Sequence, residues 1–77
     1  MHINVMIFGQ LTDLTGANLL EFENINNTNQ LVDKLTAAYP SLASAKYALA
    51  VDKKIVKENT VLQNNSTIAL LPPFSGG

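Results

Sequence analysis

Apolar and polar residues alternate over two stretches near the start of the chain, residues 3–8 and 18–23. The first stretch places three β-branched side chains on one face, those of Ile3, Val5 and Ile7. Alternation with a period of two and branched side chains are typical of half-buried strands. The pattern therefore predicts two strands, which we expect to pair antiparallel. Between them, residues 10–16 predict a compact loop or a single helical turn that Gly16 closes.

A helical pattern follows an asparagine-rich stretch. Apolar side chains recur at helical spacing over residues 31–39, at Leu31, Val32, Leu35, Ala38 and Tyr39. This stripe predicts one amphipathic helix, which ends before Pro40 because a proline pushes the preceding residue out of the α region. Two N-caps fit the sequence: Asn27, with Gln30 three residues on as in a capping box, or Thr28 alone.

The second half of the chain predicts three short strands, at residues 47–51, 55–56 and 67–71. Polar turns separate them, one at 52–54 and one at Asn64 and Asn65. Residues 41–45 indicate either a helical turn or an irregular connection. Before the last strand, a tight connection over residues 60–63 should turn Val61 and Leu62 inward.

The expected order is two strands, one helix and three strands, within a single domain over residues 1–77. The last strand carries the most continuous apolar run, which is typical of a central strand paired on both sides. The simplest packing is an α+β fold with one main helix on one face of a mixed sheet of about four to five strands. Its first and last strands lie parallel in the middle, which is the β-grasp arrangement.

The composition describes a small domain that lacks the residues of most self-contained catalysis. The chain has 77 residues, 47% of them hydrophobic, with no cysteine and a formal net charge of −1. Without cysteine there is no disulfide, thiolate nucleophile or cysteine-based metal site. The five basic residues are all lysine and do not cluster, which argues against nucleic acid. No apolar run approaches the roughly 20 residues of a membrane span and no secretory signal is recognisable, so we expect a cytoplasmic protein.

Three polar residues resemble chemical groups, but their setting predicts no chemical role for them. His2 is the single histidine and has no second ligand type at metal spacing, so we expect an exposed strand residue and no metal site. Glu21 and Glu23 share a strand face, and such regular alternation predicts a solvated edge rather than a catalytic pair.

The chain ends in Pro72-Pro73-Phe74-Ser75-Gly76-Gly77. The two prolines cannot donate ladder hydrogen bonds and hold φ near −65°, so they end the strand and send the backbone out stiff and extended. Six extended residues reach at most about 20 Å. Because glycine has no side chain, this tail, residues 72–77, can present its carboxylate inside a tunnel too narrow for a Cβ.

This tail on this order of elements resembles the small, sulfur-carrying subunit of molybdopterin synthase, a ubiquitin-like β-grasp family that ends in Pro-Pro-x-Ser/Thr-Gly-Gly. The resemblance spans nearly the whole chain. It rests on Phe8-Gly9-Gln10-Leu11, on Gly16, on the helix over 31–40, on the strand over 48–51 and on residues 68–77. The chain departs from the family at Thr12, where arginine is common, at Asp52 in place of asparagine, at Asn65 and Ser66 in place of a Gly-Asp turn, and at Phe74 in place of valine.

The resemblance implies that an E1-like enzyme uses ATP to adenylate Gly77, which then becomes a thiocarboxylate with sulfur from a donor protein. The tail would enter the large synthase subunit and give its sulfur to cyclic pyranopterin monophosphate, forming the dithiolene of molybdopterin. The chain would bind no cofactor itself and would be non-catalytic alone, as one part of a 2:2 heterotetramer with sulfurtransferase activity.

On this interpretation Gly77 carries the sulfur, and the partner-binding residues are Gly76, Ser75, Phe74, Phe8 and Leu70. Phe8 lies on the strand face opposite Ile3, so it either covers a second core or docks a partner. Two alternative functions share the tail chemistry: a ubiquitin-like modifier conjugated to lysines through Gly77, and a sulfur carrier for thiamin or another metabolite.

Overall fold

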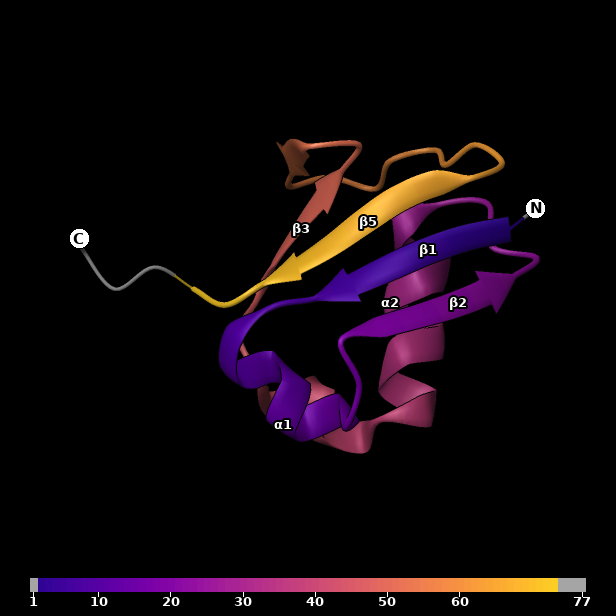
Figure 1. Cartoon of the computed structure of the whole chain (residues 1–77). Helices are drawn as coiled ribbons and strands as arrows, with labels where there is room; N and C mark the ends of the chain where they lie inside the picture. Colours follow the sequence, from indigo (N-terminus) through magenta and orange to yellow (C-terminus); the bar gives the residue numbers. More distant parts are fainter. Residues whose placement is uncertain (1, 74–77) are drawn as a thin grey trace.

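The computed structural model describes residues 2–73, which form one five-stranded mixed sheet with a single long helix against one face (Figure 1). The strands are β1 (His2–Ile7), β2 (Leu19–Glu23), β3 (Ala48–Val51), β4 (Lys54–Val56) and β5 (Ser66–Leu71). The helices are α1 (Thr12–Thr15) and α2 (Thr28–Ala38), with 3₁₀ turns at Gly9–Leu11 and Pro40–Ser44. The predicted strands and main helix are therefore present, with ends that differ by one or two residues.

The sheet has the strand order β2-β1-β5-β3-β4. The central pair, β1 and β5, is parallel, while β2 pairs antiparallel with β1 and β3 pairs antiparallel with both β4 and β5. This confirms the predicted β-grasp topology. Because β1 and β5 are parallel and adjacent, the chain leaves the sheet beside the end of its first strand, which puts the start of the tail next to Phe8 (Figure 1).

The core lies between the sheet and α2. Figure 1 shows α2 behind β1, β2 and β5, while no helix crosses the near face of the sheet. The buried side chains come from the strands, from α2 and from the connections: Ile3, Val5, Ile7, Leu11, Ile25, Leu31, Leu35, Leu42, Leu62, Ile68 and Leu70. Every second residue of β1 and β5 belongs to this set or is buried beside it, as period-two alternation requires.

Helix α2 begins within the asparagine-rich stretch and ends just before Pro40, as the sequence indicates. The side chain of Asn27 accepts a hydrogen bond from the Gln30 N–H at 2.9 Å, so Asn27 is the N-cap. The Gln30 side chain accepts from the N–H of Asn26 at 2.7 Å, one residue before the position that a strict capping box uses. The helix ends at Ala38, ahead of Pro40, as predicted.

Two inward-facing side chains were predicted wrongly. Ala38 is exposed, and at the end of the helix Tyr39 packs against the core in its place. Val61 is 78% exposed, whereas Leu62 is buried. The chain at Val61 forms an isolated bridge with Asn27, and in extended backbone neighbouring side chains point to opposite sides. Only one of the two can therefore face the core.

Candidate functional site

The root of the tail lies against the loop that follows β1. The Phe8 N–H donates to the Leu70 carbonyl oxygen at 3.1 Å, which extends the contact between β1 and β5 by one residue. Gly9 has φ +58°, and a Cβ at this position would lie 2.9 Å from Cγ of Pro72. The turn after β1 therefore packs directly on Pro72, and the absence of a side chain at Gly9 permits that approach.

The structure separates the predicted partner-binding residues into three groups. Phe8 is 40% exposed, and no second core covers it within residues 2–73. Leu70 is fully buried in the core, so its assignment as a docking residue is wrong: it faces α2, on the same side as its register partner Ile7. The remaining residues, Phe74, Ser75, Gly76 and Gly77, lie outside the described part of the chain.

The sheet face away from α2 carries an apolar surface that sequence reasoning missed. Residues paired directly across strands share a face, and the register places one apolar row across all five strands: Leu19, Met6, Ala69, Ala50 and Ile55. Leu19 is 52% exposed and Ile55 is 55% exposed. We call this row, together with Phe8 and Leu71, the open-face patch. The sequence does contain an indication of this surface: Leu19 in β2 and Ile55 in β4 are apolar residues at positions that alternate away from the core.

The open-face patch is continuous with the root of the tail. Phe8 follows the row at the end of β1, and Leu71 precedes Pro72 at the end of β5. A shallow hollow of about 580 Å³ lies beside them, lined by Met6, Phe8, Gly9 and Leu19 among others. A partner that covers this face would therefore also contact the first residues of the tail.

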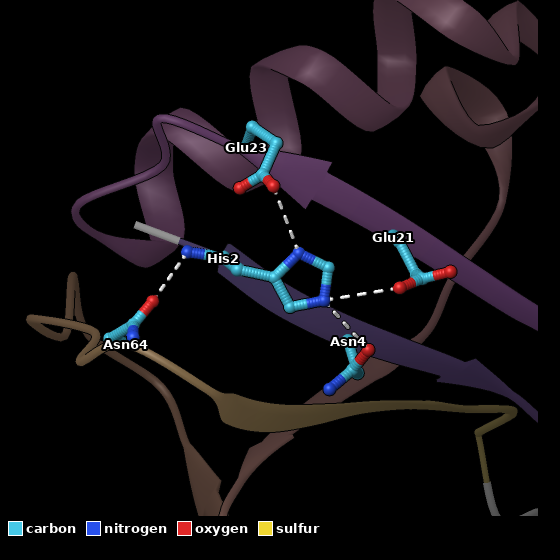
Figure 2. A network of polar contacts seen from close by, with 5 residues as sticks. All are labelled: His2, Asn4, Glu21, Glu23 and Asn64. Carbon is cyan, nitrogen blue, oxygen red and sulfur yellow. Dashed lines mark hydrogen bonds and ion pairs between the residues drawn. The ribbon is translucent and has the colours of Figure 1, made fainter.

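The other end of the same face is polar. Figure 2 shows the His2 ring between the carboxylates of Glu21 and Glu23, with Asn4 beside it. The two glutamate side chains are 63% and 67% exposed, which confirms the predicted solvated edge. His2 is less exposed than predicted, with 30% of its side chain accessible, because these neighbours enclose the ring.

Three departures from the family pattern have local structural partners. The hydroxyl of Thr12 donates to the carbonyl oxygen of Gly9 at 2.9 Å, which closes the turn below the tail root. Asp52 accepts from the N–H of Thr67 at 3.0 Å and joins the β3–β4 turn to β5. The hydroxyl of Ser66 accepts from the Gln63 N–H at 3.0 Å, and Asn65 takes the left-handed conformation, φ 67°, that its turn requires. These residues shape the scaffold.

Two further observations concern the described residues alone. No helix within residues 2–73 is long and apolar enough to cross a membrane. Over the same residues, no three His, Asp or Glu side chains are grouped in a way that could hold a metal ion.

The fold and the tail root define a class, the ubiquitin-like β-grasp domains, in which the last central strand leads directly into the C-terminal segment. The sequence profile of the ThiS family matches residues 5–77. The chain therefore belongs to the ThiS family.

Similar proteins of known structure or curated function agree with this assignment. The chain is 27% identical over 81 residues to the molybdopterin synthase sulfur carrier subunit of Arabidopsis thaliana, covering 100% of this chain and 84% of the relative. A protein–protein complex of subunits 1 and 2 of molybdopterin-converting factor from Helicobacter pylori contains a chain with TM-score 0.76 and 24% identity, with full coverage of both chains. The small archaeal modifier protein 1 of Methanosarcina acetivorans has TM-score 0.84 and 20% identity, over 99% of this chain and 96% of that one. The two structural likenesses show the shared fold.

Proposed function

We propose that this chain is the sulfur carrier subunit of a molybdopterin synthase. The observation that carries the proposal is the sequence that follows central strand β5: after Leu71 the chain reads Pro72-Pro73-Phe74-Ser75-Gly76-Gly77, in a member of the ThiS family. Two observations support it further. A curated sulfur carrier subunit matches over the full length of this chain, and Gly9 packs on Pro72 at the start of the tail.

The chemistry rests on the terminal carboxylate of Gly77. A carboxylate is a poor acyl donor, because its negative charge repels nucleophiles and it has no leaving group. In the proposed first step an E1-like partner transfers AMP from ATP to this carboxylate and releases pyrophosphate. A persulfide sulfur of a donor protein then attacks the acyl-adenylate and displaces AMP, which forms an acyl disulfide. A thiol cleaves this S–S bond, which releases the thiocarboxylate and leaves a disulfide on the thiol side. We propose that the chain binds no cofactor of its own and that the activating enzyme binds the ATP.

The partner surface in this proposal is the open-face patch together with the tail. The large apolar side chains of Met6, Phe8 and Leu19 are exposed close together on this face, and an exposed apolar patch of this kind marks an interaction surface. Capture of a C-terminal segment is a recurrent mode of recognition. We propose that the large synthase subunit covers this patch and receives the tail, in a 2:2 complex.

Intact-mass spectrometry tests the proposal. The chain is incubated with an E1-like enzyme, ATP and a sulfur donor protein, and we expect one terminal oxygen to be replaced by sulfur. Deleting Gly77 should abolish both this mass change and the conversion of cyclic pyranopterin monophosphate. A matched variant, Glu58→Gln in an exposed loop, should leave both unchanged. Normal conversion by the chain without Gly77 would refute the mechanism.

The same experiment separates the two alternative functions. A ubiquitin-like modifier would form isopeptide bonds with lysines of other proteins, so conjugates would appear after activation without any sulfur donor. A sulfur carrier for thiamin or another metabolite would acquire the thiocarboxylate but would not support pterin conversion with the large subunit. Either result would replace the proposed function with another use of the same activated Gly77.

A further inference from the structure

The ring of His2 is surrounded by hydrogen-bond acceptors on both of its nitrogens. Nδ1 lies 3.2 Å from Oε1 of Glu23, and Nε2 lies 3.1 Å from Oε1 of Glu21 and 3.2 Å from Oδ1 of Asn4 (Figure 2). A carboxylate oxygen only accepts hydrogen bonds. A neutral imidazole has a single N–H, so it can satisfy one of the two glutamates and must turn a lone pair toward the other.

We propose that His2 is a proton-controlled clamp: its imidazolium form joins β1 to β2 through Glu21 and Glu23, and loss of one proton opens the clamp. Only the imidazolium donates from both nitrogens, so only this form satisfies the arrangement that the structure shows. The proposal goes beyond sulfur transfer, because it assigns a pH-sensitive role to a part of the open face that the tail chemistry does not use.

The remaining neighbours of His2 within residues 2–73 are asparagines, which fix its position and are not titratable. The His2 N–H donates to Oδ1 of Asn64 at 2.8 Å, and the Asn65 N–H donates to the His2 carbonyl oxygen at 2.6 Å. The backbone of His2 is therefore tied to the turn before β5 while its ring reaches across to β2. Among residues 2–73, no lysine nitrogen lies within 4.0 Å of either Glu21 or Glu23, so the ring is the only cation paired with them there.

The geometry favours a clamp over a metal site. The ring stands between the two carboxylates, and each ring nitrogen takes a different one. A metal ion at Nδ1 would meet Glu23 alone, and one at Nε2 would meet Glu21 and the neutral amide oxygen of Asn4, so within residues 2–73 no three His, Asp or Glu side chains converge on one point. The cluster is therefore suited to hold a proton on the His2 ring rather than a metal ion.

The surroundings shift the titration in the direction that this assignment requires. The hydrogen bond to Glu23, supported by Asn4 and by the charges of both glutamates, raises the pKa of His2 above 6.5, although partial burial opposes the change. Protonation brings the local charge of the cluster from −2 to −1. It also brings the formal net charge of the chain from −1, counted with neutral histidine, to 0. The charge of this end of the open face therefore depends on the protonation of His2.

The effect should be confined to one end of the face. His2 opens β1 and Phe8 follows its end, and a strand advances by about 3.3 Å per residue, so roughly 20 Å separates the clamp from the tail root. Protonation of His2 should therefore alter the end of the sheet where β1 begins and β2 ends, and should leave Phe8, Leu71 and Pro72 unaffected.

An NMR titration of the full chain tests the clamp, and its readout is unambiguous because the chain has one histidine. We expect the ring protons of His2 to titrate with a pKa above 6.5, and the Glu23→Gln variant to lower that value clearly. Glu58→Gln removes the same charge from an exposed loop and should lower it far less, which separates local contact from net charge. A smaller decrease is expected for Glu21→Gln.

Two results would overturn the proposal. One is a His2 pKa at or below 6.5 in the unmodified chain, which would mean that the ring is not held between the carboxylates. The other is an equal effect of Glu23→Gln and Glu58→Gln, which would assign any increase to the overall charge. Since Glu21, Glu23 and Glu58 are all exposed, these variants should fold, and the amide spectrum of β5 verifies this.

Discussion

Leu70 and Leu19 are the same residue type on opposite faces of one sheet, and truncating each to alanine separates core from docking surface. Leu70 is fully buried, whereas Leu19 is 52% exposed. Leu70→Ala should therefore destabilise the fold. Leu19→Ala should leave the fold nearly intact and weaken association with the large subunit proposed as the partner.

The expected loss of folding free energy for each substitution follows from how deeply the side chain is buried. Leu→Ala removes three carbons, and at about 0.8 kcal/mol per buried CH₂ the transfer part is roughly 2.4 kcal/mol for a fully buried site. A residual cavity adds to this, so Leu70→Ala should cost about 2–5 kcal/mol. At Leu19 about half of the side chain is covered, which halves the transfer part to about 1 kcal/mol, an upper estimate because unfolded chains also bury apolar surface. A chain of 77 residues has a total stability of about 4–12 kcal/mol, so only Leu70→Ala threatens folding.

Urea unfolding, followed by circular dichroism, measures the free energy of unfolding of both variants beside the unmodified chain. Calorimetric titration with the large subunit then measures the affinity of Leu19→Ala. Equal destabilisation by the two substitutions would refute the assignment of the two faces. Unchanged affinity of Leu19→Ala would remove the patch from the proposed interface while leaving the core assignment intact.

Three further substitutions test local features. Asn27→Ala removes the N-cap of α2 and should lower the free energy of unfolding by about 1 kcal/mol in urea, and no change would contradict the cap. Lys53→Gly should raise the free energy of unfolding by up to about 1 kcal/mol, because Lys53 holds φ 75° in the β3–β4 turn, where glycine is unstrained. A decrease in the free energy of unfolding would show that the turn relaxes differently. His2→Gln should remove the part of the pH dependence of the free energy of unfolding that the clamp causes. The folded-state pKa of His2 is raised above 6.5, so the clamp contributes its full stability below 6.5 and loses it as pH rises through the folded-state value; a stability difference that grows with pH would contradict this.

The spacing of apolar residues, together with the positions of proline and asparagine, was sufficient to predict the fold. The alternation around Val5 indicated a half-buried strand, and the continuous apolar run that includes Ile68 indicated a central one. Both residues are fully buried, and they are register partners in the parallel pair β1–β5. Pro40 indicated the helix end, whereas the sequence left Asn27 and Thr28 open as the N-cap and the structure shows Asn27. These signals are local, and the structure keeps each of them.

Cross-strand contacts set the limit of sequence reasoning. Leu70 and Leu71 are both apolar, and only the register of β5 decides that Leu70 enters the core while Leu71 joins the open-face patch. The patch unites residues from five strands, and the His2 clamp joins residues that are 19 and 21 positions apart. Pairing partners and register come from the assembled sheet, so the sequence alone does not show that Met6, Phe8 and Leu19 lie together on one face.

We propose that Gly77 carries sulfur, and the mass of the intact chain is the decisive measurement. The protein should be isolated together with its activating enzyme under non-reducing conditions and analysed before and after addition of ATP and a sulfur donor. We expect one terminal oxygen to be exchanged for sulfur, and peptide fragmentation to place the change at Gly77. An unchanged mass with an active enzyme, or sulfur located at any other residue, would contradict it.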